Sequence, residues 1–217
     1  MDTKIKQIRR DILNTSFEAG ACHIGSALSC VEILVNLYYN ILKEGDVFLF
    51  SKASGVATFY AILADKGYFA KENLAYYLRE YPLANKVVPG VIHSVGSLGH
   101  GLPVAVGLAL GDRSKNVYCL IGDAEVQEGT FWESILFARQ HKLKNLKIMV
   151  DKNELQACGK TQDILCIDKA LELITQLFPI QIINTVKGAG VREMEHKFEW
   201  HYWNLSQEQL DKALKEL

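Results

Sequence analysis

Two polar motifs, each at the end of an apolar run, constrain the fold of this chain more than any other feature. The apolar run 117–121 is followed by residues 122–125, Gly-Asp-Ala-Glu, and the apolar run 146–150 is followed by residues 151–153, Asp-Lys-Asn. The stretch between the motifs, residues 127–140, has the pattern of a helix. Strand, helix and strand in this order predict two parallel strands with their carboxyl ends at one edge of a sheet, where open α/β sheets bind ligands.

Asp123 and Asn153 are expected to converge at that edge of the sheet. Carboxylate and amide oxygens are hard ligands, and a Mg²⁺ ion held by few protein oxygens usually carries the phosphates of a cofactor. Gly122 would let the backbone approach a phosphate, and the helix that follows offers free N–H groups to an anion. A turn whose Asp caps a helix is the alternative for residues 122–125, and the Asn at matching spacing favours the cofactor site.

The composition limits the functions open to the chain. The 217 residues carry a net charge of −1 and are 49% hydrophobic, so a substantial core is possible and no basic field indicates binding to nucleic acid or membrane. The five cysteines have no paired spacing and indicate reduced thiols of a cytoplasmic protein without a zinc site. The N-terminus has no apolar signal core, and Glu32, Asn36 and Asn40 interrupt the longest apolar helix, which argues against a membrane span.

Periodicity and turn residues predict an alternation of helices and strands. Helices are expected over residues 3–18, 29–42, 55–66, 71–80, 101–110, 127–140 and 168–178, and strands over 47–50, 117–121, 146–150 and 180–186. Ser206 and Gln209 form a capping box that begins a terminal helix, whereas residues 82–99 and 188–203 have no periodicity. The alternation predicts an α/β fold, a mainly parallel sheet with helices on both faces, in one domain over residues 1–217.

Several segments together resemble the transketolase family of thiamine diphosphate enzymes, over nearly the whole chain. The two strand-end motifs resemble its thiamine diphosphate motif, and residues 21–25, Ala-Cys-His-Ile-Gly, resemble its Gly-His-x-Gly loop. Residues 95–102 resemble its Gly-Ser-Leu-Gly-Gln-Gly segment, with His100 in the place of Gln. Residues 185–190, Thr-Val-Lys-Gly-Ala-Gly, and residues 199–201, Glu-Trp-His, resemble segments near the end of the family's diphosphate-binding domain. The resemblance implies the thiamine diphosphate-binding fold.

The resemblance also implies roles for individual residues. The side chains of Asp123 and Asn153 and the main-chain carbonyl of Leu155 would hold Mg²⁺, or Ca²⁺ in its place. The cofactor would contact the set His23, Ser54, Gly96, Ser97, Leu98, Gly122, Asp123, Ala124, Glu125, Asn153 and Leu155. The resemblance implies four residues in catalysis. His23, His100 and His201 would transfer protons and contact substrate hydroxyl groups, and Glu128 would lie at a subunit contact, coupled to the catalytic Glu of the opposing domain.

Each of these residues also has a structural interpretation. A single loop histidine such as His23 is often structural, and His201 lies among aromatic residues that indicate a packing cluster. Glu125 and Glu128 are acids in a first helical turn, where they complement the helix dipole. His100 would then belong to a flexible loop that caps a helix.

The chain departs from the family in ways that affect its substrate and its sheet. Ser54 stands at the position of a His in the family, and a hydroxyl can donate to a phosphate oxygen but carries no positive charge. This difference argues against an ordinary sugar-phosphate substrate. Segments are expected to be trimmed after residue 42, before residue 89 and within residues 165–180, where the family has a further helix and strand.

In the family, the catalytic Glu and the aromatic pyrimidine pocket belong to a different domain, and this chain ends at Leu217 in a capped helix. The chain is therefore expected to be the diphosphate-binding half of a split enzyme, in an α₂β₂ heterotetramer with a second chain that carries the pyrimidine-binding domain. The implied reaction of carbohydrate metabolism transfers a two-carbon ketol unit from a ketose to an aldehyde acceptor with thiamine diphosphate. The alternatives are a subunit of a decarboxylating or acyl-transferring enzyme for 2-keto acids, and a non-catalytic scaffold partner.

Overall fold

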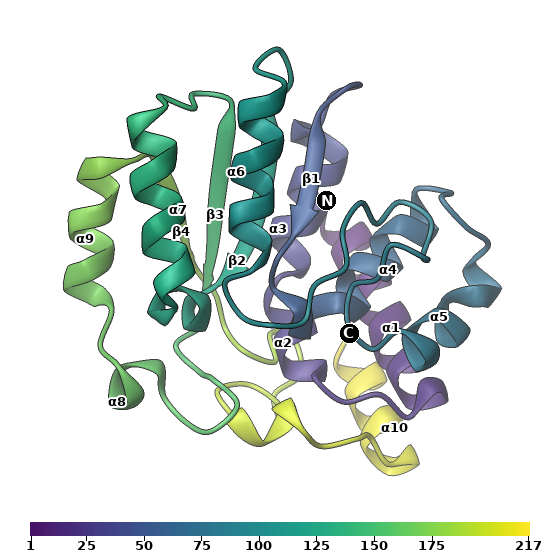
Figure 1. Ribbon diagram of the computed structural model, residues 1–217. Helices are drawn as coiled ribbons and strands as arrows, with labels where there is room; N and C mark the ends of the chain where they lie inside the picture. Colours follow the sequence, from purple (N-terminus) through teal and green to yellow (C-terminus); the bar gives the residue numbers. More distant parts are fainter.

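A sheet of four parallel strands runs through the middle of the molecule, as a computed structural model of residues 1–217 shows (Figure 1). The strands lie in the order β1-β2-β3-β4, with the bounds β1 Val47–Phe50, β2 Val117–Gly122, β3 Leu146–Lys152 and β4 Ile180–Asn184. Gly122 pairs with Asp151, so the ends of β2 and β3 are level. All four predicted strands are confirmed, although β4 ends before the predicted residue 186.

Ten α-helices surround the sheet. Their bounds are α1 Asp2–Ala19, α2 Ile24–Ser29, α3 Val31–Asn36, α4 Val56–Asp65, α5 Leu74–Glu80, α6 Gly101–Gly111, α7 Gly129–Gln140, α8 Thr161–Ile164, α9 Asp168–Leu177 and α10 Gln207–Glu216. A π-helical turn covers Leu37–Ile41, and short 3₁₀ helices cover Ala53–Gly55, Lys71–Asn73, Asp123–Gln127 and Phe198–His201. None of the helices combines the length and the apolar character that crossing a membrane requires.

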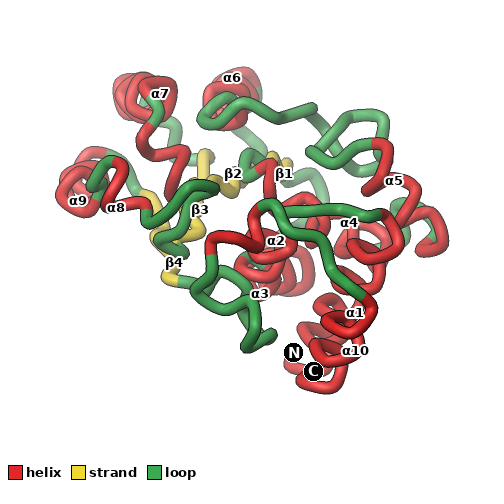
Figure 2. The backbone as a smooth tube through the Cα atoms, turned by 90° about the horizontal axis from the view of Figure 1, so that it is seen from below, coloured by secondary structure: helices red, strands yellow, loops and turns green.

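Helices cover both faces of the sheet, which confirms the predicted fold class (Figure 2). Helices α1 to α5 and α10 pack on one face around the larger core, and α6, α7 and α9 pack on the other face around a smaller core. The alternation of side chains along a strand creates this division, because Cys119 and Ile121 enter the smaller core while Leu120 between them enters the larger one.

Two helices differ in their bounds from the helices that the sequence pattern predicted. The helix predicted over residues 29–42 begins at Ile24 and is interrupted at Cys30, whose N–H donates to Ala27 O at 3.3 Å. Ser26 O, the helical acceptor for that N–H, instead accepts from the ammonium of Lys52 at 2.7 Å, and the hydroxyl of Ser29 turns inward to the carboxylate of Asp151. The helix predicted over residues 127–140 begins at Gly129, because Asp123–Gln127 form a separate 3₁₀ turn.

The terminal helix α10 begins at the predicted capping box. The N–H of Gln209 donates to Ser206 Oγ at 3.2 Å, and the N–H of Ser206 donates to Gln209 Oε1 at 3.0 Å. Helix α10 packs on α1, so the two ends of the chain lie close together (Figure 2). The segment that leads into α10 carries the 3₁₀ helix Phe198–His201 to the carboxyl edge of the sheet, beside α2.

Candidate functional site

A cavity of about 350 Å³ lies beyond the carboxyl ends of β2 and β3. The predicted site residues that line it are His23, Ser54, Gly96, Leu98, Gly122, Asp123, Ala124, Glu125, Asn153, Leu155 and His201. Three predicted residues are outside this lining: Ser97 and His100 are exposed, and Glu128 is half-buried as the N-cap residue of α7. The fold therefore brings together in one cavity residues that are widely separated along the chain.

Asp123 is a buried carboxylate without a cationic partner. Its side chain is only 3% exposed, and none of the ion pairs in the structure includes it. Its oxygens accept the N–H of Ala124 at 2.9 Å and the N–H of Glu154 at 2.6 Å. Burial raises the pKa of Asp123 above its usual range. A cation bound to its oxygens would offset the cost of burying this negative charge.

The turn after β3 presents the two other predicted metal ligands. Glu154 has a φ of 64°, and this left-handed conformation brings the N–H of Leu155 back to Asn153 Oδ1 at 3.1 Å. The ammonium of Lys187 donates to the carbonyl oxygens of Leu155 and Gln156, each at 3.1 Å. A carbonyl oxygen has two lone pairs, so Leu155 O can still accept a second partner. The three oxygens and the uncompensated charge of Asp123 fit a hard divalent cation.

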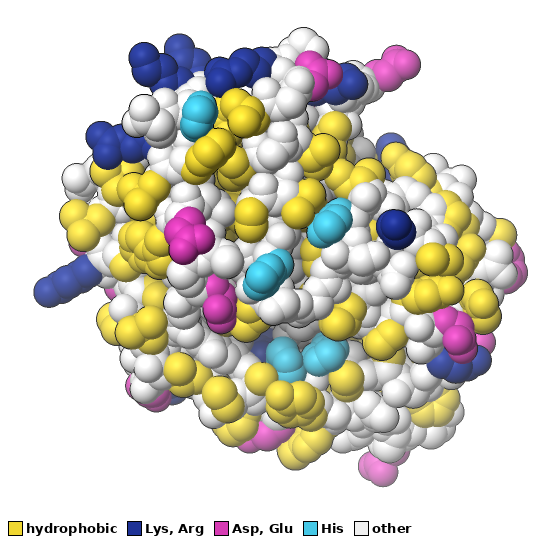
Figure 3. All heavy atoms as spheres, viewed as in Figure 1, with side chains coloured by type: hydrophobic (Ala, Val, Ile, Leu, Met, Phe, Trp, Pro, Cys, Tyr) yellow, Lys and Arg dark blue, Asp and Glu magenta, His cyan; other side chains and the backbone are white.

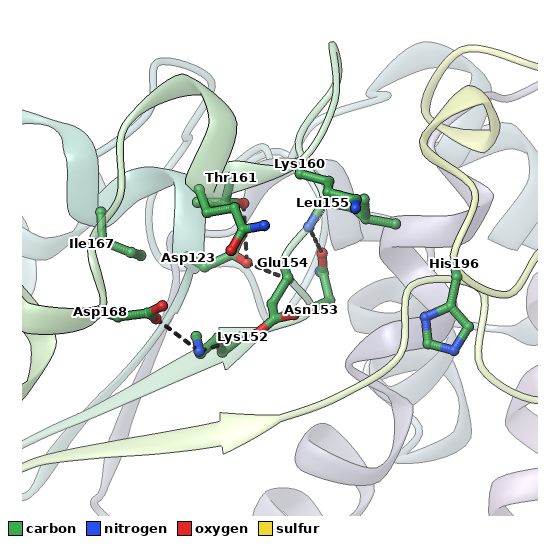
Figure 4. Close-up of a pocket in the computed structure, with 11 residues that line it drawn as sticks. Asp123, Lys152, Asn153, Glu154, Leu155, Lys160, Thr161, Ile167, Asp168 and His196 are labelled. Carbon is green, nitrogen blue, oxygen red and sulfur yellow. Dashed lines mark hydrogen bonds and ion pairs between the residues drawn. The ribbon is translucent and has the colours of Figure 1, made fainter.

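A second cavity, of about 180 Å³, lies on the other side of these ligands (Figure 4). Asp123, Asn153 and Leu155 line both cavities and so form part of the wall between them. In this second cavity, Lys152 pairs with Asp168 at 3.0 Å and with Glu154 at 3.1 Å. These ion pairs tie the start of α9 to the end of β3 and support the turn that carries the predicted ligands.

His23 and His201 meet at the opposite wall of the larger cavity. Their ring centroids are 4.6 Å apart. The main-chain N–H of His23 donates to the main-chain carbonyl of His201 at 3.0 Å, and this bond holds His23 at a φ of 66°. Burial lowers the pKa of both rings, that of His201 to about 3. His201 Nδ1 accepts from Lys187 Nζ at 3.4 Å, and the ring also packs on Tyr202. Both imidazoles are thus neutral at physiological pH, and the low pKa makes His201 a weak base whose Nδ1 is already occupied by Lys187.

Glu125 joins the ends of three segments. Its Oε1 accepts the hydroxyl of Ser51 and the N–H of Gly99, and its Oε2 accepts the N–H of Gly122 at 2.7 Å. Gly99 has a φ of 77°, and a Cβ there would lie 2.4 Å from Thr130 Oγ1. The carboxylate therefore fixes residues 95–102 at their glycine-rich end, and burial raises its pKa. This segment is anchored at Gly99, and it is exposed from Gly96 to Leu98.

The sequence analysis did not identify several residues of this site. The cavity is also lined by Ser26, Lys52, Ala53, Leu83, Gln156 and Ala157. The most important of them is Lys52, which is buried and lies 3.1 Å from the carboxylate of Asp151. One signal was available, because Lys52 lies two residues after the end of β1, near the position that Asp123 occupies directly after β2. Lys187 belongs to residues 185–190, which resemble a family segment, but only the folded chain brings its ammonium to Leu155, where burial lowers its pKa to about 8.

Comparison with known proteins identifies the family of this chain and several relatives. The family model described as thiamine pyrophosphate enzyme, C-terminal TPP binding domain, matches residues 73–217. The chain is 38% identical to a subunit of the apulose-4-phosphate transketolase of Actinobacillus succinogenes, across 100% of this chain and 95% of that protein. It is 30% identical to the 6-deoxy-6-sulfo-D-fructose transketolase subunit SqwG of Clostridium sp., across 97% of this chain and 93% of that protein.

Solved structures have the same fold. Transketolase from Leishmania mexicana superposes with a TM-score of 0.81 at 20% identity, over 96% of this chain and 40% of that chain. The chain thus spans about 40% of the length of the solved transketolases that it matches. The alignment with the Actinobacillus relative extends over 265 positions, more than the 217 residues here, so that relative carries segments without a counterpart in this chain.

The fold and the matched family model define the class: this chain belongs to the family of thiamine pyrophosphate enzymes. Within that family it is a transketolase-type chain, because relatives at 38% and 30% identity over nearly their full length are transketolase subunits. The predicted family, the fold class and transfer of a ketol unit with thiamine diphosphate are therefore confirmed.

Proposed function

We propose that the chain is the diphosphate-binding subunit of a split transketolase, and that it holds the cofactor through a divalent cation. Asp123, Asn153 and the carbonyl of Leu155 would bind Mg²⁺ or Ca²⁺ against the diphosphate. The observation that carries this proposal is the convergence of these oxygens on one cavity, with the Asp123 carboxylate buried and free of any ion pair. Cations of this kind prefer such oxygen ligands and keep further positions for phosphate.

Thiamine diphosphate supplies the carbanion chemistry when it is bound, and the chain supplies binding, orientation and charge. Gly122 and Ala124 leave the backbone accessible at the floor of the cavity. His23 and His201 face the cavity as neutral imidazoles that can form hydrogen bonds to substrate hydroxyl groups, and His23 is the better candidate to exchange a proton with them, because the pKa of His201 is about 3. Lys52 and Lys187 add positive charge close to the predicted metal ligands.

A partner subunit would complete the site with the pyrimidine-binding half, and we propose an α₂β₂ assembly. Two observations support a partner: the Actinobacillus and Clostridium relatives are named as subunits, and the chain covers only about 40% of the matched solved transketolases. The exposed residues Gly96 to Leu98 lie at the open side of the cavity, where the remainder of the cofactor would meet a second chain.

The groove between α6 and α7 is the surface that we assign to this partner. It has a volume of about 410 Å³, and Pro103, Val106, Leu110 and Phe137 contribute its apolar lining. Figure 3 shows hydrophobic side chains gathered over these two helices. Glu128 is the N-cap residue of α7 and lies against Gly99, and its contact with the partner is part of this proposal.

The substrates would be small sugar-type ketoses and aldehydes. The Actinobacillus relative is named for apulose 4-phosphate and the Clostridium relative for a sulfofructose, and both names contain an anionic sugar. Ser54 lines the cavity here and offers a hydroxyl rather than a positive charge. We therefore assign recognition of any anionic substrate group to the partner side of the cavity.

Calorimetric titration of thiamine diphosphate with Mg²⁺ tests this function, with the chain alone and with its candidate partner subunit. We expect tight binding that appears only, or much more strongly, in the mixture. Asp123→Ala should abolish it, whereas the exposed control Asp211→Ala on α10 should bind like the wild type. A folded chain that binds no cofactor in either sample would contradict the proposal and favour a scaffold role.

A further inference from the structure

A third carboxylate, Asp151, is completely buried at 0% exposure behind the lining residues Asp123 and Glu125, and it is not one of the predicted ligands. Both of its oxygens are engaged: Ser29 Oγ donates to Oδ2 at 2.6 Å, and the hydroxyl of Thr185 donates to Oδ1. The ammonium of Lys52 lies 3.1 Å from Oδ2. A buried charge persists only with such partners, since desolvation opposes it strongly. Asp151 therefore joins α2, the end of β1 and the end of β4.

Lys52 has no hydrogen left for a ligand, although it lines the cavity. Its ammonium donates to Ser26 O at 2.7 Å and to Ser29 Oγ at 3.2 Å, and its third partner is Asp151. An ammonium has three donors, so all of them are committed within the protein. Lys52 can thus act on a bound anion through its fixed charge and not through a direct hydrogen bond, as long as this arrangement holds.

The same cluster reaches one of the predicted metal ligands. Asn153 Nδ2 donates to Ser29 Oγ at 3.4 Å, and Ser29 is the residue that donates to Asp151. Because the amide is held through its nitrogen, its oxygen is the atom directed to the turn at Leu155. The orientation of Asn153 therefore depends on a hydroxyl that Asp151 fixes.

We propose that Asp151 is a positioning residue for the cofactor site. It holds the Lys52 ammonium at the floor of the cavity and, through the Ser29 hydroxyl, orients the side-chain oxygen of Asn153 toward a cation. This inference rests on the proposed function, in which the cavity receives a divalent cation and a diphosphate. It explains why the fold retains a fully buried ion pair behind the predicted ligands, where an apolar pair would fill the same space.

The test measures cofactor and metal affinity in the assembled complex of the full chain with its partner subunit. Mn²⁺ replaces Mg²⁺, so that electron paramagnetic resonance reports bound metal independently of activity, and calorimetry reports thiamine diphosphate. Residues that orient a metal ligand typically contribute roughly 10–100-fold to affinity, and Asp151→Asn should weaken Mn²⁺ binding by that factor. The exposed controls Lys147→Met and Asp211→Asn should leave both affinities unchanged.

The double variant Lys52→Met/Asp151→Leu separates positioning from stability. Replacing both members of a buried ion pair by apolar residues is often neutral for stability. We expect this variant to recover the melting temperature lost in Asp151→Asn but not the Mn²⁺ affinity. If it recovers both, the pair acts only in folding and the proposal is overturned.

Ser29→Ala provides a second route, because it removes the link to Asn153 while the Lys52–Asp151 pair stays intact. It should weaken Mn²⁺ binding as Asp151→Asn does. If Asp151→Asn does not fold, Ser29→Ala alone tests whether this link orients Asn153. Wild-type affinity in Ser29→Ala would overturn the proposed link. A wild-type complex that binds neither ligand would instead contradict the proposed function, so the two failures are distinguishable.

Discussion

The floor of the cavity and its rim are built in different ways. At the floor, Asp123, Glu125 and Asn153 are buried, and hydrogen bonds to the surrounding turns fix each of them. At the rim, Gly96 and Leu98 are exposed. Under the proposed function, this chain would hold the diphosphate at the floor, while the arrangement above it would depend on a second surface.

The first prediction concerns the floor and carries the largest expected effect. Asp123→Ala should lower the affinity for thiamine diphosphate with Mg²⁺ by more than about 100-fold, because it removes the only charged metal ligand. The fold should survive, since Asp123 is in no ion pair and its removal leaves no charge unpaired. Calorimetry with the partner present and circular dichroism of the chain check the two parts. Unchanged affinity would show that the floor does not hold the metal.

The second prediction concerns the surface beside the rim. Phe137→Asp should prevent assembly with the partner subunit, because a charge in the α6–α7 groove would lose its water on docking. Phe137 is 43% exposed, so the stability of the chain alone should change by no more than about 0.5 kcal/mol. Sedimentation velocity of the mixture measures assembly. Tyr76→Asp on α5, where Tyr76 is 53% exposed, is the control, and equal assembly of both variants would contradict the assigned surface.

The third prediction concerns the joint between floor and rim. Gly99→Ala should destabilise the chain by about 1–3 kcal/mol, because φ is positive there and the new Cβ would lie 2.4 Å from Thr130 Oγ1. Gly107→Ala inside α6 meets no atom within 4 Å and should stabilise the chain by roughly 0.5–1 kcal/mol. Urea unfolding of the two variants compares them. A Gly99→Ala chain as stable as the wild type would mean that the segment is not anchored there.

The smallest effect is expected for a side chain of the rim. The Ser97 hydroxyl is exposed and forms no hydrogen bond within the chain, and the family resemblance implies a contact through backbone groups in this segment. Ser97→Ala should therefore change cofactor affinity by less than about twofold, within the usual range of surface substitutions. A much larger loss in the assembled complex would show that the rim contributes side chains as well as backbone.

The floor was largely predictable from the sequence, and the reason is local. Asp123 and Asn153 each follow an apolar strand directly, so the strand pattern and the parallel connection suffice to bring them together. Lys187 and Asp151 acquire their contacts only where the ends of β1 to β4 line one edge of the sheet, and no pattern along the chain specifies which side chains meet there. The break at Cys30 was missed for a related reason, because the hydroxyl of Ser29 serves a residue more than a hundred positions away.

Anomalous diffraction from Mn²⁺ in crystals of the assembled complex with thiamine diphosphate tests the central claim most directly. The account predicts one peak in the cavity, with oxygens of Asp123, Asn153 and the carbonyl of Leu155 bound directly to the ion. A complex that binds the cofactor with the ion on other residues, or with no ion at all, would contradict it.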